Sequence, residues 1–492
     1  MPLLPFGEYK PDISDYEGQA TKNILNVIPT GDGYAPFPSF AGLSSSLPSA
    51  CRGAFYALKS DGSVKIFAGT ATKLYVLDNS NSTWTDASSG GSTYSQLSDS
   101  AQWQFAQTGN YVFATQANAV LQVFNLASGS AFSAALGSPP QAAYISVVGR
   151  FLVLSGLLSS PYRIQWSGLN DFNSANSWTA GLNSSDSQDF PDGGIVRGVA
   201  GGEFGTIFQD QAIRSMSYIP GSPLVFQIDR ITDRLGLYAP YSIVRAGSQI
   251  FFYAGQGFFK IDPGQPPVQI GRERVDRTFL IDLDRTSLQM LIGAQDPRSS
   301  RIFWAYKSGA GAAGQFDKIL GYDPVLDRFF RLSLSGEYFV GLSQAGLGIT
   351  LENLDSISTS IDALPLSLDA YSTTIQPQLA MFSTSHALGF FTGSALEATV
   401  ESGEQGTDDN LIGIEGFRPI TDAATCYGTI SSRMTQQATP QSSTERLINS
   451  RTGLVDTHKT TRYSRFKVRI PAGTTWTYAA GVVPKLVVEG EQ

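Results

Sequence analysis

The sequence has 492 residues, of which 42% are hydrophobic and only 15% are charged, and its formal net charge is −8. This length is enough for two or three domains with a large buried core. The acidic balance argues against a protein that grips nucleic-acid phosphates, and the lack of any stretch of about 18 apolar residues argues against a membrane span. The first residues, MPLLPFGEYKPD, lack the basic start and apolar run of a secretory signal, so we expect a reducing cytoplasm.

Residues 1–45 form an arm that is rich in proline and glycine. Residues 24–28 are its one strand-like piece, and turn-forming residues follow them. β-Propellers often complete their ring with a strand lent by one end of the chain. We therefore predict that residues 24–28 are a ring-closing strand.

Residues 46–360 contain a recurring hairpin, of which RAGSQIFFYAGQGFFKID (residues 245–262) is the clearest copy. Two runs of β-branched and aromatic residues flank a glycine-rich turn that tolerates positive φ angles. Related phrases begin at Lys65, Tyr111, Phe151, Gly205, Arg301 and Tyr338. Their uneven spacing brackets the roughly 40–50 residues of a four-stranded propeller blade. Because no long amphipathic helix is visible either, we predict an all-β chain with a propeller of six or seven irregular blades.

The repeat is lost after residue 360, and residues 361–492 predict a separate β domain. The segments ALEATVESGE, CYGTISSR and RYSRFKVRIP show strand-like alternation. They favour a β-sandwich-like fold, which we assign to an assembly interface. Residues 432–451 are polar and predict a loop that orders only on a partner.

The residues needed for catalysis are scarce. His386 and His458 are the only histidines, and nothing around them resembles a Ser-His-Asp or Cys-His arrangement. No Cys or His pair has zinc-ligand spacing, and no local pattern marks two carboxylates for glycoside hydrolysis. We therefore predict no enzyme activity and no catalytic, metal or cofactor site. Cys51 and Cys426 lie in different predicted domains, and we expect both to be unpaired thiols.

A basic stripe near the C-terminus is the most distinctive charge pattern. Strand alternation from residue 465 to 470 places Arg465, Lys467 and Arg469 on one face and apolar side chains on the other. The stripe is either a solvated face or a docking surface for an acidic partner, with nucleic-acid binding less favoured. The candidate partner-binding residues are Lys459, Arg462, Arg465, Lys467 and Arg469.

Several phrases together resemble one known family, the tail nozzle proteins of short-tailed bacteriophages, also called tail tubular protein B or packaged-DNA stabilisation proteins. The phrases are spread over most of the chain. They are NVIPTGDGYAPFP (residues 26–38), DFPDGGIVRGVAGGEFGTIFQDQAIRSM (189–216), RITDRLGLYAPYSIV (230–244), GQGFFKI (255–261), IGRERVDRTFLIDLD (270–284) and RYSRFKVRIPAGTTWTYAAGV (462–482).

The resemblance implies a structural virion protein of the viral tail, assembled in the host cytoplasm. Six copies would form a ring below the head–tail adaptor, with tail fibres, a spike or a needle attached nearby. Double-stranded DNA would pass transiently through the ring, which would help to retain and eject the genome. Two other classes stay open, namely a glycan-binding or glycan-degrading propeller and a bacterial surface interaction propeller.

Overall fold

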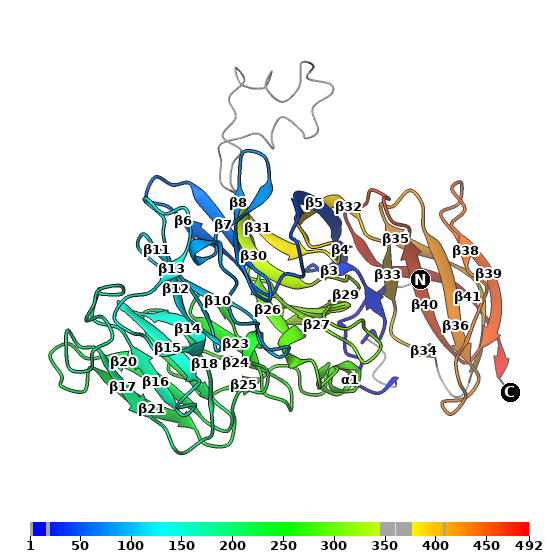
Figure 1. Ribbon diagram of the computed structural model, residues 1–492. Helices are drawn as coiled ribbons and strands as arrows, with labels where there is room; N and C mark the ends of the chain where they lie inside the picture. Colours follow the sequence, from blue (N-terminus) through cyan, green and yellow to red (C-terminus); the bar gives the residue numbers. More distant parts are fainter. Residues whose placement is uncertain (1–2, 16–19, 345–359, 361–375, 407–409, 492) are drawn as a thin grey trace.

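A computed structural model describes residues 3–15, 20–344, 360, 376–406 and 410–491 (Figure 1). The chain is all-β and consists of a β-propeller and a β-sandwich, as the sequence predicts. The propeller occupies the left and centre of Figure 1, and the sandwich lies at its right edge. Within the described residues the propeller has seven four-stranded antiparallel sheets.

The first three sheets follow one another along the chain, and each is a simple meander. The first sheet contains β6 (Ala54–Leu58), β7 (Val64–Gly69), β8 (Leu74–Asp78) and β9 (Thr83–Asp86). The second contains β10 (Gln104–Thr108), β11 (Tyr111–Gln116), β12 (Ala119–Asn125) and β13 (Ser133–Ala134). The third contains β14 (Ala142–Val148), β15 (Phe151–Leu157), β16 (Arg163–Trp166) and β17 (Asp186–Asp189).

The next three sheets repeat this pattern. The fourth contains β18 (Val196–Ala200), β19 (Gly205–Gln209), β20 (Ile213–Tyr218) and β21 (Phe226–Thr232). The fifth contains β22 (Val244–Ala246), β23 (Gln249–Tyr253), β24 (Phe258–Ile261) and β25 (Val268–Gln269), and helix α1 (Asp276–Asp282) follows it. The sixth contains β26 (Ile292–Gln295), β27 (Ile302–Tyr306), β28 (Lys318–Asp323) and β29 (Arg328–Leu332).

The last sheet closes the ring with a strand from the N-terminal part of the chain. It contains β30 (Tyr338–Gln344), β31 (Gln376–Phe382) and β32 (Ala387–Ala395), and β32 pairs with β5 (Pro38–Ser46). Its first strand, β30, contacts β6, which completes the circle of sheets. A strand from the N-terminal part of the chain does close the ring, as predicted. The assignment of residues 24–28 as that strand is wrong. The propeller also extends past residue 360, because β31 and β32 belong to it.

The second strand of each of the first six sheets is buried on both faces, which explains the continuous apolar runs of the repeated phrases. Trp304 in β27 is fully buried. Its ring centroid lies 4.5 Å from that of Phe258 in the preceding sheet, and its indole nitrogen donates to the carbonyl of Ser242 at 2.9 Å. Such contacts join each sheet to the next and make the propeller rigid.

The sandwich is built from both ends of the described chain. One sheet has the order β3 (Val27–Pro29), β4 (Tyr34–Pro36), β41 (Ala479–Glu491), β35 (Asn410–Thr421) and β39 (Val455–Thr461), with β1 (Leu4–Pro5) also on β41. The other has the order β2 (Ile24–Leu25), β33 (Ala398–Glu401), β40 (Tyr463–Ile470), β36 (Tyr427–Arg433) and β37 (Gln441–Ser442). In that sheet β34 (Gln405–Gly406) also pairs with β40, and β38 (Arg446–Leu447) also pairs with β36. The strand-like residues 24–28 therefore belong to this domain.

The core between the two sheets confirms the predicted direction of β40. Phe466, Val468 and Ile470 are each only 1% exposed, and the ring of Phe466 meets that of Phe417 edge-on at 5.2 Å. The prediction of an unstructured segment over residues 432–451 is wrong, because β37 and β38 pair with β36. Cys51 and Cys426 are free, buried thiols, as expected. In the described part of the chain, no helix has the length and apolar character required to cross a membrane.

Candidate functional site

The basic stripe on β40 is largely neutralised within the chain. The Arg465 guanidinium lies 2.5 Å from the Asp15 carboxylate and 3.3 Å from that of Glu404. Arg433 of β36 also pairs with Glu404, whose side chain is only 5% exposed. This cluster joins the N-terminal arm, through Asp15, to the centre of the second sheet.

Arg469 at the other end of the stripe has partners of its own. Its guanidinium lies 2.9 Å from Glu397 and 2.7 Å from Glu445, and it covers the ring of Tyr427 at 4.5 Å. Hydrogen bonds from Arg469 lower the pKa of the Glu445 carboxyl. The segment that carries Glu445 is therefore held to β40 by charge.

The remaining stripe residues differ in exposure. Lys467 and Arg462 are half-buried, whereas Lys459 lies exposed on β39, which ends its sheet. Docking of an acidic partner stays a prediction for this face. The ion pairs of Arg465 and Arg469 already hold segments of the sandwich together.

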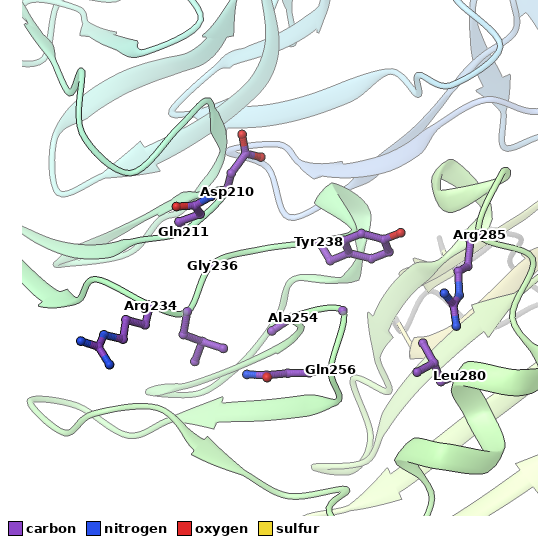
Figure 2. Close-up of a pocket in the computed structure, with 11 residues that line it drawn as sticks. Asp210, Gln211, Arg234, Gly236, Tyr238, Ala254, Gln256, Leu280 and Arg285 are labelled. Atoms are coloured by element: carbon purple, nitrogen blue, oxygen red, sulfur yellow. The ribbon is translucent and has the colours of Figure 1, made fainter.

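A pocket at the centre of one propeller face is the second candidate, and the sequence did not reveal it. Loops from several sheets surround its volume of about 600 Å³, including residues 98–101 before β10, residues 210–211 after β19 and residues 237–241 before β22. A second hollow of about 420 Å³ adjoins it and shares Asp210, Gln211, Tyr238 and Arg285 (Figure 2). We call the two together the mouth pocket.

The segment between β21 and β22 forms one wall of the mouth pocket. Leu237 donates its backbone N–H to Gln209 at 2.9 Å, and Tyr238 donates to Tyr253 at 3.1 Å. At Gly236 the backbone runs so close to Asp210 that a Cβ atom would lie 2.2 Å from the Asp210 carbonyl oxygen. These contacts fix the wall to the loops of the fourth and fifth sheets.

The floor of the mouth pocket joins residues of several sheets. The Tyr241 hydroxyl accepts from the backbone N–H of Gln102 at 2.9 Å, and the Gln102 amide donates to the Gln289 carbonyl at 3.1 Å. Tyr144 packs edge-on against Tyr241 at 6.0 Å, and burial raises the pKa of Tyr144 to about 12. Segments of the second, third, fifth and sixth sheets are thus joined to one another beneath the mouth pocket.

The charges around the mouth pocket do not cancel. Arg197 pairs with Asp210 at 2.6 Å. Arg234 and Arg285 are exposed, and neither forms an ion pair with any carboxylate of the described residues. In the view of Figure 2, Tyr238 lies between these two arginines. No single local motif contains this group, because Arg234 and Tyr238 lie between β21 and β22 whereas Arg285 follows α1.

Asp276, the first residue of α1, supports the rim of the mouth pocket from below. Its carboxylate accepts from the Phe258 N–H at 3.1 Å and from the Gln269 amide at 2.8 Å. Gly257 and Gly271 leave room for it, since a Cβ atom at either position would lie within 2.2 Å of the carboxylate. Burial raises the pKa of Asp276 from 3.8 to about 6.

This shift predicts a pH-dependent stability. The native state holds the Asp276 proton more tightly than the unfolded state, so its contribution is fully present below about pH 4 and is lost as the pH rises to about 6. Asp276→Asn removes this titration. The free energy of unfolding of the variant should gain about 3 kcal/mol relative to the parent between pH 4 and pH 7.5.

Urea unfolding at a series of pH values measures this difference. Asp233→Asn, at an exposed position, is the matched control and should keep a constant offset from the parent. A constant offset for Asp276→Asn as well would contradict the assignment.

Cys51, Glu337 and His386 are the described residues that come nearest to a catalytic grouping. Glu337 lies 2.6 Å from the His386 ring nitrogen and accepts from the backbone N–H of Cys51 at 3.0 Å. The Cys51 thiol itself faces the Gly53 carbonyl at 3.4 Å, and burial raises its pKa. A fully buried, protonated thiol without a base suits a structural role near the ring closure. No group of three or more metal-ligating side chains occurs in the described residues.

Comparisons with known proteins give little information beyond the fold that the strand pairing already shows. No family model and no curated protein matches the chain. The extracellular domain of a one-component system from B. thetaiotaomicron is 10% identical, with a TM-score of 0.41 over 78% of this chain and 43% of that one. The RRP9 WD40 repeats are 8% identical, with a TM-score of 0.38 over 63% of this chain and 91% of that one. This chain spans less than half of the first protein, and neither similarity bears on function.

Proposed function

We propose that this chain is a structural protein of a short-tailed bacteriophage tail, with six copies forming a nozzle ring below the head–tail adaptor. The supporting observation is that two of the segments that resemble the family lie side by side. Residues 26–38 and 462–482 are far apart in sequence, yet Tyr34 pairs with Ala479 in the sandwich. A Cβ atom on Gly33 would lie 2.3 Å from the Ala479 carbonyl oxygen, so the two segments fit closely.

The contacts beneath the mouth pocket bear on how DNA would pass. The hydrogen bond between Gln102 and Tyr241 joins segments of the second and fifth sheets, and it supports a DNA channel that lies between copies in the proposed ring and not within one. The acidic net charge of −8 favours weak contact with passing phosphates. The virion and the host cytoplasm are the corresponding locations, with the adaptor and fibres, a spike or a needle as partners.

We also propose that the chain has no hydrolase activity. Glycoside hydrolysis commonly needs two carboxylates on either side of the bond. Asp210 is the single carboxylate among the residues that line the mouth pocket, and Arg197 already neutralises it. Turnover of host polysaccharide by the purified chain would contradict this proposal.

A glycan-binding propeller is the second candidate function. The observation that favours it is Tyr238, whose side chain is 41% exposed beside the mouth pocket. Exposed aromatic rings in a polar pocket are a usual way to hold a sugar face. This function and the tail role can coexist in one virion protein.

Electron microscopy and native mass spectrometry test the tail role. The purified chain is examined alone and with a head–tail adaptor ring, and we expect six-fold rings in the presence of the adaptor. A chain that stays monomeric under both conditions across a range of salt concentrations would rule out the nozzle assignment.

A further inference from the structure

The unpaired arginines of the mouth pocket point to an anionic ligand. Arg234 and Arg285 carry two uncompensated charges on a chain whose net charge is −8. A guanidinium presents a planar fork of donors that matches a carboxylate with two parallel hydrogen bonds. Both arginines line the same hollow as Tyr238, which suits a ligand with at least two separated acidic groups.

Tyr238 is held as a flat surface between them. On one side Gly255 approaches so closely that its Cβ atom would lie 3.0 Å from the ring, and the Tyr253 ring meets it edge-on at 6.2 Å. The opposite side of the ring contributes to the 41% exposure of the side chain. A ring that is held by these two contacts and is 41% exposed can stack on a ligand without a large loss of side-chain freedom.

The polar groups around the platform favour a sugar over other anions. Gln211 and Gln256 are exposed amides that can both donate to and accept from hydroxyl groups. A peptide site of this size would need apolar anchor pockets, whereas the smaller hollow, which holds both Arg234 and Arg285, exposes more polar than apolar surface. The two hollows share Asp210 and Tyr238, and their volumes of about 420 and 600 Å³ give room for several linked sugar rings.

We propose that the mouth pocket binds a linear acidic polysaccharide, with Arg234 and Arg285 on its carboxylates and Tyr238 beneath a sugar ring. This inference stands on the pocket and is independent of ring assembly. Because the charges are exposed, affinity should fall as salt rises.

Isothermal titration of the full chain with tetramannuronate, an acidic tetrasaccharide, tests the proposal, with neutral cellotetraose as the matched ligand. Arg234→Gln and Arg285→Gln keep polar side chains but remove the charge, and each should weaken tetramannuronate binding roughly tenfold. Tyr238→Ala should also weaken it, whereas Tyr238→Phe should retain most of the affinity. Arg451→Gln, an exposed arginine of the sandwich, should bind as the parent does.

Thermal unfolding of each variant identifies any loss that comes from misfolding. Equal binding of cellotetraose, no binding of tetramannuronate, or undiminished binding by Arg234→Gln and Arg285→Gln would each overturn the proposal. Preferential binding of hexaglutamate or of a thymidine oligonucleotide would also overturn it, because the pocket would then serve a peptide or a nucleic acid. Six-fold rings that form normally from the pocket variants would show that the site is separate from assembly.

Discussion

Glu404→Gln should lower the free energy of unfolding of the sandwich by about 3 kcal/mol, although it replaces a single atom. Glu404 is buried, and its carboxylate forms ion pairs with both Arg433 and Arg465. Those side chains are only 7% and 14% exposed, so removal of the carboxylate leaves two arginines in a poorly hydrated site, in which Asp15 is the carboxylate that still pairs with both. An uncompensated buried charge costs far more than a lost surface pair.

Urea unfolding followed by tryptophan fluorescence checks this result, because Trp476 is buried in the sandwich. Glu415→Gln is the matched control, since it removes a carboxylate that pairs with Lys485 on the surface of the same domain. That pair should contribute less than about 1 kcal/mol. Equal midpoints for the two variants would mean that the buried cluster does not stabilise the fold.

The same geometry changes what is expected of the basic stripe. Replacement of Arg465, Lys467 and Arg469 by serine leaves Glu404 and Glu445 without these partners. A triple variant would therefore lose stability before any effect on docking could be measured. Lys459 is the position at which docking can be tested alone, because its side chain is exposed.

Gly389→Val should open the propeller where its ring closes. Gly389 of β32 pairs with Gly42 of β5, and a Cβ atom at position 389 would lie 2.2 Å from the Ala41 carbonyl oxygen and 2.6 Å from the Phe40 ring. The backbone oxygen cannot move aside without breaking the pairing of the two strands. We expect a loss of at least about 2–3 kcal/mol in the free energy of unfolding.

Hydrogen exchange across residues 38–46 locates the effect. The backbone amides of β5 should exchange faster in the variant, while those of the fourth sheet should change little. Gly309→Val is the matched control, because its Cβ atom would have no neighbour within 4 Å. Protection of β5 at the parent level in Gly389→Val would contradict the proposed role of this contact.

The strands β2, β3 and β5 of the N-terminal arm show what the sequence could predict and what it could not. Residues 24–28 carry the apolar character of a strand, and they do form β2 and part of β3. Strand character does not specify a partner, however, and both strands pair in the sandwich. The true closing strand, PSFAGLSSS, has no apolar alternation because it is the outermost strand of its sheet and is largely half-exposed. Its role depends on β32, which lies far along the chain.

The same limit applies to the candidate sites, where local features were predictable and contacts between distant segments were not. The direction of β40 was predictable because alternation between Arg465 and Ile470 is a local property of one strand. The partners of Arg465 were not, since Asp15 and Glu404 come from other segments. The mouth pocket was missed for the same reason, because Arg234, Tyr238 and Arg285 come from loops whose meeting is set by the order of the sheets.

The late arrival of pairing partners has a consequence for synthesis on the ribosome. The strand β5 leaves the exit tunnel early but cannot pair until β32 has been translated. The strand β4 can pair with β3 at once, but its other edge must wait for β41. At about 5–20 residues per second, this delay lasts on the order of tens of seconds. During that time the nascent chain presents unpaired strand edges to its neighbours on the same messenger RNA. Production of this protein should therefore depend on chaperones that shield nascent chains. A lower growth temperature should raise its soluble yield.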